Sequence, residues 1–282
     1  EEIIELIRAE LESDQVTESE LLEKLEDYHE NDIAQSLEEL SKEEIRAIEK
    51  AYNLPEKTCV EIGYPLFDEM LANFKSMPKI ENKRKKILIA PSWQDGNISE
   101  TCLDKILDSI KDKDYNIIVR PHPQHVRHCP ALFEDYKIRY KDYENIDIQT
   151  DFSSNNPVLE ADVLITDWSD IVWEFSLITE RPAVFINTKM KEMNPEWKKI
   201  DIVPLNIEYR EVLGKSVNIE DTGKVSEVIE YVITNKESYR EAILKVKQEQ
   251  LYNHGNSAYF GGRYILEAVM KKVEARRKTN EQ

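Results

Sequence analysis

One stretch decides how this sequence folds: Ala161-Asp162-Val163-Leu164-Ile165-Thr166-Asp167-Trp168-Ser169-Asp170-Ile171-Val172-Trp173-Glu174-Phe175. The apolar residues 163–165 predict a short buried strand, and the polar residues 166–169 predict a turn. Ser169 is a favourable helix N-cap, and the apolar residues that follow it recur at helical spacing. The stretch therefore predicts a strand–loop–helix unit.

This unit indicates a ligand site as well as a fold. In α/β sheets, ligands bind beyond the carboxyl ends of the strands, where helix N-termini offer backbone N–H groups and a positive dipole end. We therefore expect a phosphate or nucleotide-diphosphate site around Thr166–Asp170. The alternative is an ordinary strand-to-helix turn with a serine cap, the commonest connection in α/β domains.

The residues around this unit repeat the same alternation of strand and helix. Short apolar strands are predicted at 87–90, 115–119, 146–148 and 183–186. Helices are predicted at 67–74, 102–110, 157–159, 225–234, 237–251 and 257–276. Strands this short and apolar are typical of a parallel sheet covered on both faces. Residues 55–282 are thus predicted to form a Rossmann-like, doubly wound α/β domain.

The first 54 residues differ in character from the rest. Residues 1–50 hold 18 acidic and 5 basic residues, a net charge of −13, which leaves −5 for the remainder of the 282-residue chain. Thr17 with Glu20, and Ser41 with Glu44, form capping boxes ahead of apolar residues at helical spacing. We therefore predict a small acidic all-α module over residues 1–54.

Composition narrows the classes of function. A net charge of −18 argues against non-specific nucleic-acid binding. The three scattered cysteines fit a reducing, cytoplasmic setting, and there is no apolar run of about 18 residues that would span a membrane. No signal peptide is visible, and a first residue other than Met is typical of a fragment or a trimmed chain.

Polar residues with binding chemistry follow three of the predicted strands, and these loops should converge at one edge of the sheet. They are Ser92 and Trp93 after the first strand, Arg120 and His122 after the second, and Thr166, Asp167, Ser169, Asp170 and Glu174 in the central unit. An arginine suits phosphate oxygens, and a histidine beside it can donate a proton or a hydrogen bond to a phosphoryl group.

His122 leaves two other interpretations open. It could be a structural histidine that caps the end of the strand. The spacing His122-x-x-His125-x-x-His128-Cys129 also resembles a zinc-binding pattern, but it places the ligands on one face only if the segment is helical, and Pro123 and Pro130 argue against a long helix. We expect no resident metal.

Several motifs together resemble the CDP-glycerol glycerophosphotransferase family, the teichoic-acid and capsule-type poly(glycerol-phosphate) transferases. They are Ile62-Gly63-Tyr64-Pro65, Ile89-Ala90-Pro91-Ser92-Trp93, Arg120-Pro121-His122-Pro123, Leu164 to Asp170 with Glu174-Phe175, and Tyr252-Asn253-His254-Gly255-Asn256-Ser257. The resemblance covers roughly residues 60–265. It implies the C-terminal half of a GT-B fold, which holds the CDP-linked donor.

The resemblance also implies roles for individual residues. Arg120 and His122 would contact the donor pyrophosphate, and His122 would aid the departure of CMP. Thr166, Asp167 and Ser169 would form the nucleotide-phosphate loop, and Glu174 would face the nucleotide near the ribose. Ser92 and Trp93 would line the same pocket.

Two features depart from the family pattern. The family uses a histidine in its N-terminal half as the base that activates the acceptor hydroxyl, and no histidine here matches it, since His29 has a different context. Asp170 stands where many members carry a second serine. Its carboxylate suits a helix N-terminus but would repel a pyrophosphate, unless it points away or binds a divalent cation.

The acidic module has a resemblance of its own. The amino-acid sequence from Leu21 to Glu44 is similar to the cytosolic N-terminal helical domain of bacterial magnesium transporters. This resemblance implies that the carboxylates of the module could bind a hard cation. The alternatives are a solvated acidic surface or a surface that binds a partner.

From the sequence we expect transfer of glycerol phosphate from CDP-glycerol to a hydroxyl of a polymer or glycolipid acceptor, with this chain supplying the donor half-site. The alternatives are a non-catalytic nucleotide-binding or interaction module, and a GT-B glycosyltransferase that uses another nucleotide sugar. We expect a cytoplasmic protein with a peripheral contact to the inner membrane face, completed by a partner chain or an N-terminal half.

Overall fold

The computed structural model describes residues 59–78, 84–190 and 202–280, together with positions 46, 50, 55, 56, 192 and 198. The predicted acidic module of residues 1–54, with its resemblance to magnesium transporters, lies outside these residues apart from positions 46 and 50. The division of the chain at residue 54 therefore stays a prediction.

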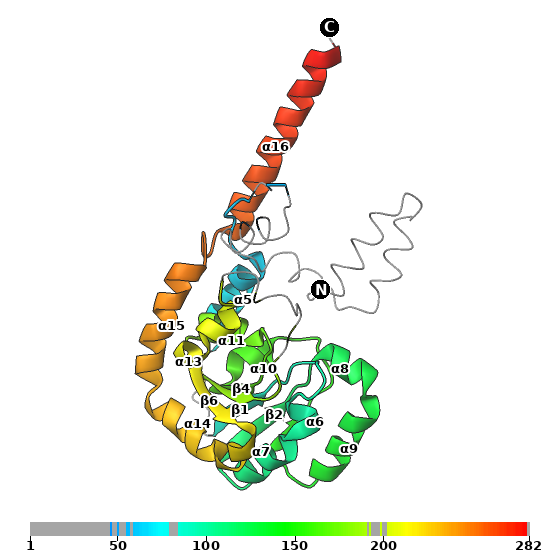
Figure 1. The fold of residues 1–282 in the computed structure, drawn as a ribbon, viewed down its shortest axis with the longest axis vertical. Helices are drawn as coiled ribbons and strands as arrows, with labels where there is room; N and C mark the ends of the chain where they lie inside the picture. Colours follow the sequence, from blue (N-terminus) through cyan, green and yellow to red (C-terminus); the bar gives the residue numbers. More distant parts are fainter. Residues whose placement is uncertain are drawn as a thin grey trace.

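A parallel sheet forms the centre of the described residues (Figure 1). Its strands are β1 (Lys85–Ile89), β2 (Tyr115–Val119), β3 (Ile146–Ile148), β4 (Val163–Thr166), β5 (Ala183–Asn187) and β6 (Gly214–Asn218). They lie in the order β3-β2-β1-β4-β5-β6, and every neighbouring pair is parallel. The chain order reverses between β1 and β4, which is the position where doubly wound sheets bind ligands.

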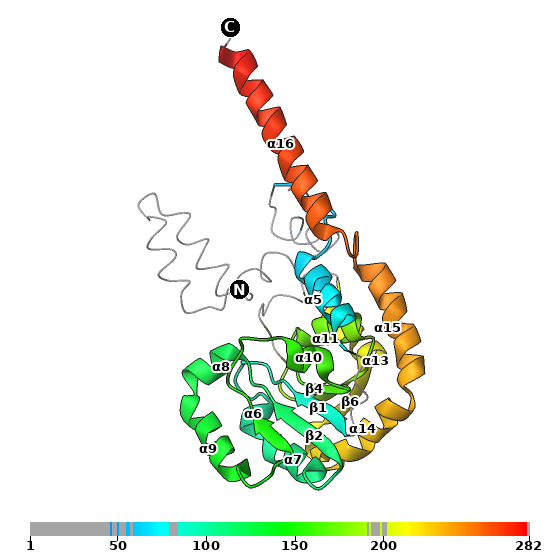
Figure 2. The same cartoon turned by 180° about the vertical axis from the view of Figure 1, so that it is seen from behind.

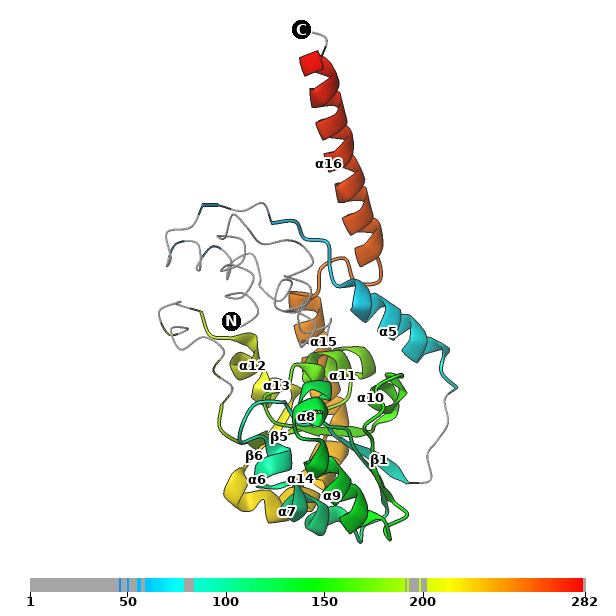
Figure 3. The same ribbon diagram turned by 90° about the vertical axis from the view of Figure 1, so that its right-hand side faces the viewer.

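Helices cover both faces of the sheet (Figure 3). One face carries α6 (Ile98–Thr101), α7 (Leu103–Ile110), α9 (Pro130–Tyr140) and α14 (Val225–Thr234). The other carries α5 (Pro65–Ser76), α10 (Asn156–Glu160), α11 (Ile171–Thr179), α13 (Arg210–Leu213) and α15 (Lys236–Gln250). The predicted Rossmann-like α/β fold is therefore correct.

Alternation along each strand builds two separate cores. In β1, Ile87 and Ile89 pack with α7 and α14, while Leu88 points to the opposite face and packs with α5 and α11. All three side chains are fully buried. Because successive strand residues point to opposite faces, a strand between two helical layers must be apolar throughout. This explains why the strands of this chain read as short continuous apolar runs.

The remaining helices surround the carboxyl edge and the chain end. They are α8 (Pro123–His128), α12 (Leu205–Glu208), the 3₁₀ helix η2 (Ile219–Lys224) and α16 (Ser257–Asn280). Figures 1 and 2 show α16 standing away from the sheet and its covering helices. Exposed apolar residues lie along it, including Tyr259, Ile265 and Leu266. None of the described helices is both long enough and apolar enough to cross a membrane.

Two predicted helix starts need comment. The helix expected at 102–110 is found as α7, but a separate short helix, α6, precedes it from Ile98, where Asn97 accepts the N–H of Ser99 and caps it. Ser169 is not the cap of α11, since the N-cap position is Asp170, whose side chain makes no capping bond. Asp170 instead accepts a hydrogen bond from Asn206 of α12.

The loop 252–257 closes against the start of α5, which joins two motifs far apart in the sequence. The carboxylate of Asp68 accepts the backbone N–H groups of Gly255 at 2.6 Å and Ser257 at 2.7 Å, so it caps α16 from a distant segment of the chain. Gly63, at φ +91°, lies against the same loop. A side chain at Gly63 would overlap the Ser257 hydroxyl and the Tyr252 carbonyl.

We therefore expect Gly63→Ala to lower the free energy of unfolding by about 2 kcal/mol, from the unfavourable φ and the overlap together. Gly262 is the matched control, because it lies inside α16 with open space around it. Gly262→Ala should leave stability unchanged or raise it by up to about 1 kcal/mol. Urea unfolding of both variants measures the difference, and equal midpoints would contradict the packing described here.

Candidate functional site at the carboxyl edge of the sheet

The loops that follow β1, β2 and β4 meet at the carboxyl edge, as predicted. Asp167 joins two of them. Its carboxylate accepts the backbone N–H of Ser92 at 2.8 Å, of Ile98 at 3.0 Å and of Trp168 at 2.8 Å. The Asp167 side chain is 1% exposed. It therefore ties the loop after β1 to the loop after β4 on either side of the point where the strand order reverses.

Thr166, the residue before Asp167, has a similar role. Its hydroxyl is fully buried and donates to the carbonyl of Ala90 at 2.7 Å. Thr166 and Asp167, which the sequence suggested as phosphate contacts, both direct their side chains into the protein. They shape the loop from within and leave the contact with a ligand to their neighbours.

Ser169 and Asp170 are half-buried and lie at the start of α11. The Asp170 carboxylate is held by Asn206, whose own side-chain oxygen accepts from Trp173 Nε1 at 2.6 Å. Asp170 therefore points toward α12. This corresponds to the first of the two outcomes expected for this residue, a carboxylate turned away from the phosphate site.

Arg120 lies directly after β2 and is 7% exposed. Its guanidinium donates to the Ser154 carbonyl at 2.7 Å and lies 5.5 Å from the centre of the Phe152 ring. Burial lowers the pKa of Arg120, and the carboxylates of Asp151 and Glu174 oppose that shift. The side chain thus brings a permanent positive charge to a largely dry edge of the sheet, where it acts strongly on an anion.

His122 caps α8. Its Nδ1 accepts the backbone N–H of Gln124 at 3.1 Å, so the neutral ring carries its proton on Nε2. The ring centres of His122 and Trp93 are 6.3 Å apart. The cap is at the start of helix α8 and not at the end of the strand, as one interpretation of the sequence had it, and the same bond fixes the ring in the tautomer that donates from Nε2.

The other histidines of this segment do not join His122. His125 is 3% exposed, with Nδ1 3.2 Å from Asn97 Nδ2 and Nε2 3.0 Å from Glu100 Oε1. Burial lowers the pKa of His125, while Glu100 opposes the shift. His128 is exposed at the other end of α8. Among the described residues, no group of three or more His, Cys, Asp or Glu is arranged to hold a metal ion.

Glu174 lies in the first turn of α11. Burial and the neighbouring Asp170 carboxylate raise the pKa of Glu174 to about 7, although the charge of Arg120 acts in the opposite direction. A carboxylic acid that titrates near neutrality beside a buried arginine is typical of a functional site. The place of Glu174 beside a ligand stays a prediction.

Arg210 of α13 is a site residue that the sequence analysis missed. It is 8% exposed and donates to the Asp167 carbonyl at 2.6 Å from behind the loop. An arginine at the start of a four-residue helix carries no sequence signal for such a role.

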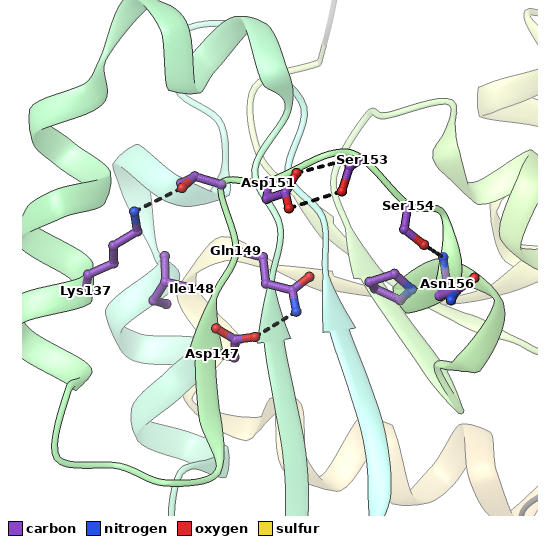
Figure 4. A pocket seen from close by; sticks show the side chains of 10 residues that line it. Lys137, Asp147, Ile148, Gln149, Asp151, Ser153, Ser154 and Asn156 are labelled. Atoms are coloured by element: carbon purple, nitrogen blue, oxygen red, sulfur yellow. Dashed lines mark hydrogen bonds between the residues drawn. The ribbon is translucent and has the colours of Figure 1, made fainter.

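A shallow pocket of about 480 Å³ opens at the carboxyl end of β3 (Figure 4). Its lining is mostly polar and includes Lys137, Asp147, Gln149, Asp151, Ser153 and Asn156. Figure 4 shows Asp151 bound to Ser153 within the loop that also carries the Ser154 carbonyl. Because that carbonyl accepts from Arg120, the pocket adjoins the arginine site along the same edge.

Comparison with known proteins assigns a family. The model of the family "CDP-Glycerol:Poly(glycerophosphate) glycerophosphotransferase" matches residues 10–259, and so includes most of the predicted acidic module. The teichoic acid glycerol-phosphate primase of Bacillus subtilis strain 168 is 27% identical over 158 residues, which are 54% of this chain and 39% of the primase. The teichoic acid ribitol-phosphate primase of Bacillus spizizenii is 26% identical over 152 residues, 48% of this chain and 36% of that protein.

A solved structure agrees with the fold. The wall teichoic acid polymerase TagF matches with a TM-score of 0.51 and 19% identity, over 83% of this chain and 57% of that one. This likeness supports the predicted GT-B type of fold. The chain spans about two-fifths of the length of the two primases.

Proposed function

The chain belongs to the CDP-glycerol:poly(glycerophosphate) glycerophosphotransferase family, and from this premise we propose that it binds CDP-glycerol at the carboxyl edge of its sheet. The reaction served is transfer of glycerol phosphate to a hydroxyl of a polymer or glycolipid acceptor. The observation that carries the proposal is that Arg120 and His122, which follow β2, and the N-terminus of α11, which follows β4, lie at the same carboxyl edge on the two sides of β1.

The charges of the edge suit a pyrophosphate. Arg120 is a fixed cation, and α11, with nine residues, adds the positive end of its dipole and its free N–H groups. The hydroxyl of Ser169 stands at that helix start. Thr166 and Asp167 serve the donor indirectly, because their buried bonds hold the loop in which Ser169 sits.

The reaction breaks one P–O bond and forms another. The acceptor oxygen attacks the phosphorus that bears glycerol, and CMP leaves with the electrons of the bridging P–O bond. His122, with its proton on Nε2, donates to the departing phosphate oxygen, and Arg120 balances the negative charge that develops there. The proton of the acceptor hydroxyl goes to a base outside the residues named here.

Titration calorimetry with CDP-glycerol and CDP tests the proposal. The parent chain should bind both, and Arg120→Ala and His122→Ala should each weaken binding by about tenfold or more, the usual worth of a hydrogen bond to a charged group. Arg127→Ala and His128→Ala are matched controls, because both residues are exposed on α8. They should bind as the parent does.

Three results of these experiments would contradict the proposed function or one part of it. No binding of either cytidine ligand at millimolar concentration would reject the donor site. A preference for a UDP-sugar would assign another nucleotide-dependent transfer, and binding without turnover in the presence of acceptor would favour a binding module. Repeating the titration with Mg²⁺ and with EDTA measures any need for a divalent cation.

We also place the protein in the cytoplasm, at the inner face of the membrane, where a nucleotide-activated donor and a membrane-bound acceptor meet. The thiols of Cys102 and Cys129, neither of which is in a disulfide, support a reducing compartment. Fractionation of cells that produce the chain, followed by a high-salt wash of the membranes, tests this location. Protein that stays in the membrane after the wash would contradict a peripheral, charge-based contact.

A further inference from the structure

The guanidinium of Arg210 makes its hydrogen bonds to protein atoms, on the inner side of the loop that forms the candidate site. Its guanidinium donates to the carbonyl of Asp167 at 2.6 Å and to the carbonyl of Ile186 at 3.0 Å. It also bonds the side-chain oxygen of Asn187, at 3.1 Å from one terminal nitrogen and 3.3 Å from Nε. One side chain of α13 thus binds the ends of β4 and β5 together.

Two aromatic rings fix the plane of the guanidinium. Its central carbon lies 4.1 Å from the centre of the Trp168 ring and 4.5 Å from that of Phe185. A planar group that stacks on rings and donates in several directions is specific to arginine, since lysine offers neither the plane nor the fork. Burial lowers the pKa of Arg210 to about 10, so it remains charged at neutral pH.

The bond to Asp167 sets the direction of a peptide group. The Asp167 carbonyl points inward to Arg210, while the carboxylate of the same residue takes the N–H groups of Ser92 and Trp168. Hydrogen bonds to both the backbone and the side chain of Asp167 therefore hold the loop after β4 in place. A carbonyl turned inward keeps its negative dipole end away from an anion at the start of α11.

We propose that Arg210 is a positioning residue for the donor site, which holds the Asp167–Trp168 peptide so that Ser169 and the N-terminus of α11 face the phosphates. The inference rests on the proposed function for the identity of the ligand. It adds a residue that touches no atom of the ligand yet contributes a buried positive charge behind the loop that receives it.

Arg181 offers a matched control. It is half-buried, donates to the carbonyl of Ala161, and lies with its guanidinium carbon 5.7 Å from the Phe74 ring centre. Ala161 precedes β4, so this arginine supports the opposite, amino edge of the sheet. Arg181→Gln removes the same chemistry as Arg210→Gln but leaves the carboxyl edge intact.

The experiment combines hydrogen exchange with ligand titration on the full chain. In Arg210→Gln, backbone exchange in the peptide that covers residues 163–171 should rise by about tenfold or more relative to peptides of β1 and β2. The dissociation constant for CDP should rise by about tenfold or more, as misplaced ligand-binding groups generally cause. Arg210→Lys should behave like Arg210→Gln, because it restores charge without the fork.

Arg181→Gln should change neither measurement at the carboxyl edge. If both arginine variants lose affinity in proportion to their loss of thermal stability, or if exchange in 163–171 stays at the parent level in the Arg210 variants, the positioning role is overturned. If the parent chain binds no CDP, the proposed function fails, and the exchange comparison alone decides whether Arg210 holds the loop. Should Arg210→Gln not fold, Arg210→Lys and Arg181→Lys form the same comparison.

Discussion

Asp167→Ala is expected to lower the free energy of unfolding by about 3 kcal/mol or more and to abolish CDP binding. The substitution leaves the N–H groups of Ser92, Ile98 and Trp168 without their acceptor, and each orphaned buried donor costs about 1 kcal/mol or more. The two loops that the carboxylate joins then lose their common anchor. Guanidinium unfolding and calorimetry measure the two effects.

Asp95→Ala is the control for this variant, because Asp95 is exposed in the same loop after β1. Its effect on stability should lie within about 0.5 kcal/mol of zero. Asp167→Asn retains one oxygen but turns an amide N–H₂ toward backbone donors, so it should fall between the parent and the alanine variant. An Asp167→Ala protein as stable as the parent would show that the three bonds do not hold the edge.

In contrast to Asp167→Ala, Glu174→Gln is expected to raise the free energy of unfolding, by about 3 kcal/mol at pH 8. Burial raises the pKa of Glu174 from 4.5 to about 7. The folded protein thus binds a proton that the unfolded chain has already lost, so stability falls as the pH rises from about 4.5 to 7. Each pKa unit corresponds to about 1.4 kcal/mol, and the full penalty is present only above pH 7.

Unfolding curves of parent and variant at pH 5 and pH 8 test this sign. The gain in Glu174→Gln should be less than about 1 kcal/mol at pH 5 and should reach its full value at pH 8. Glu227→Gln, at an exposed glutamate in the first turn of α14, should show no such pH dependence. A gain that is equal at both pH values would mean that Glu174 titrates normally.

The two variants also separate stability from function. The raised pKa predicts that the ionised Glu174 destabilises the fold above pH 7, and in the proposed site the same group would act on the donor together with Arg120. We therefore expect Glu174→Gln to weaken CDP binding while it stabilises the chain. Asp167→Ala lowers both quantities together.

Much of the sheet could be predicted from the sequence because its strands are buried on both faces. The expected ranges 115–119 and 146–148 coincide with β2 and β3. The strand β6 was missed, since its residues Gly214–Asn218 alternate between buried and exposed at the edge of the sheet and include polar side chains. The other edge strand, β3, was predicted because isoleucines stand at both of its ends, whereas β6 offers a single apolar residue, Val217.

Helices α8 and α9 were missed for a different reason. Pro123 and Pro130 argued against one long helix, and this is correct, but each also stands in the first turn of a short helix, where the missing N–H costs nothing. Each proline begins a new helix, so the segment forms two short helices and not one long one. Their separation leaves His122 at the start of α8 and His128 at its end.

The sequence predicted that the loops after three strands converge, and the structure brings them to one edge of the sheet. Arg120 and His122 could be singled out because they directly follow an apolar strand, and Glu174 because it belongs to the strand–loop–helix unit. Whether a polar side chain faces the ligand or the interior depends on loop geometry, and this is why Asp167 and Thr166 are found holding the loop. Two of the three acceptors of Arg210 are backbone carbonyls, which every residue has, so the sequence gives no sign of them.

The closure of the loop 252–257 on α5 has a consequence for synthesis of the chain. The two backbone N–H groups that Asp68 accepts, those of Gly255 and Ser257, are synthesised 187 and 189 residues after it. At a ribosomal rate of 5–20 residues per second, that interval lasts roughly 10–40 s. The first helix of the sheet domain therefore leaves the ribosome with its anchoring carboxylate unpaired. The strands can pair as they are synthesised, but the hydrogen bonds between Asp68 and the loop 252–257 form only after that late segment has left the ribosome.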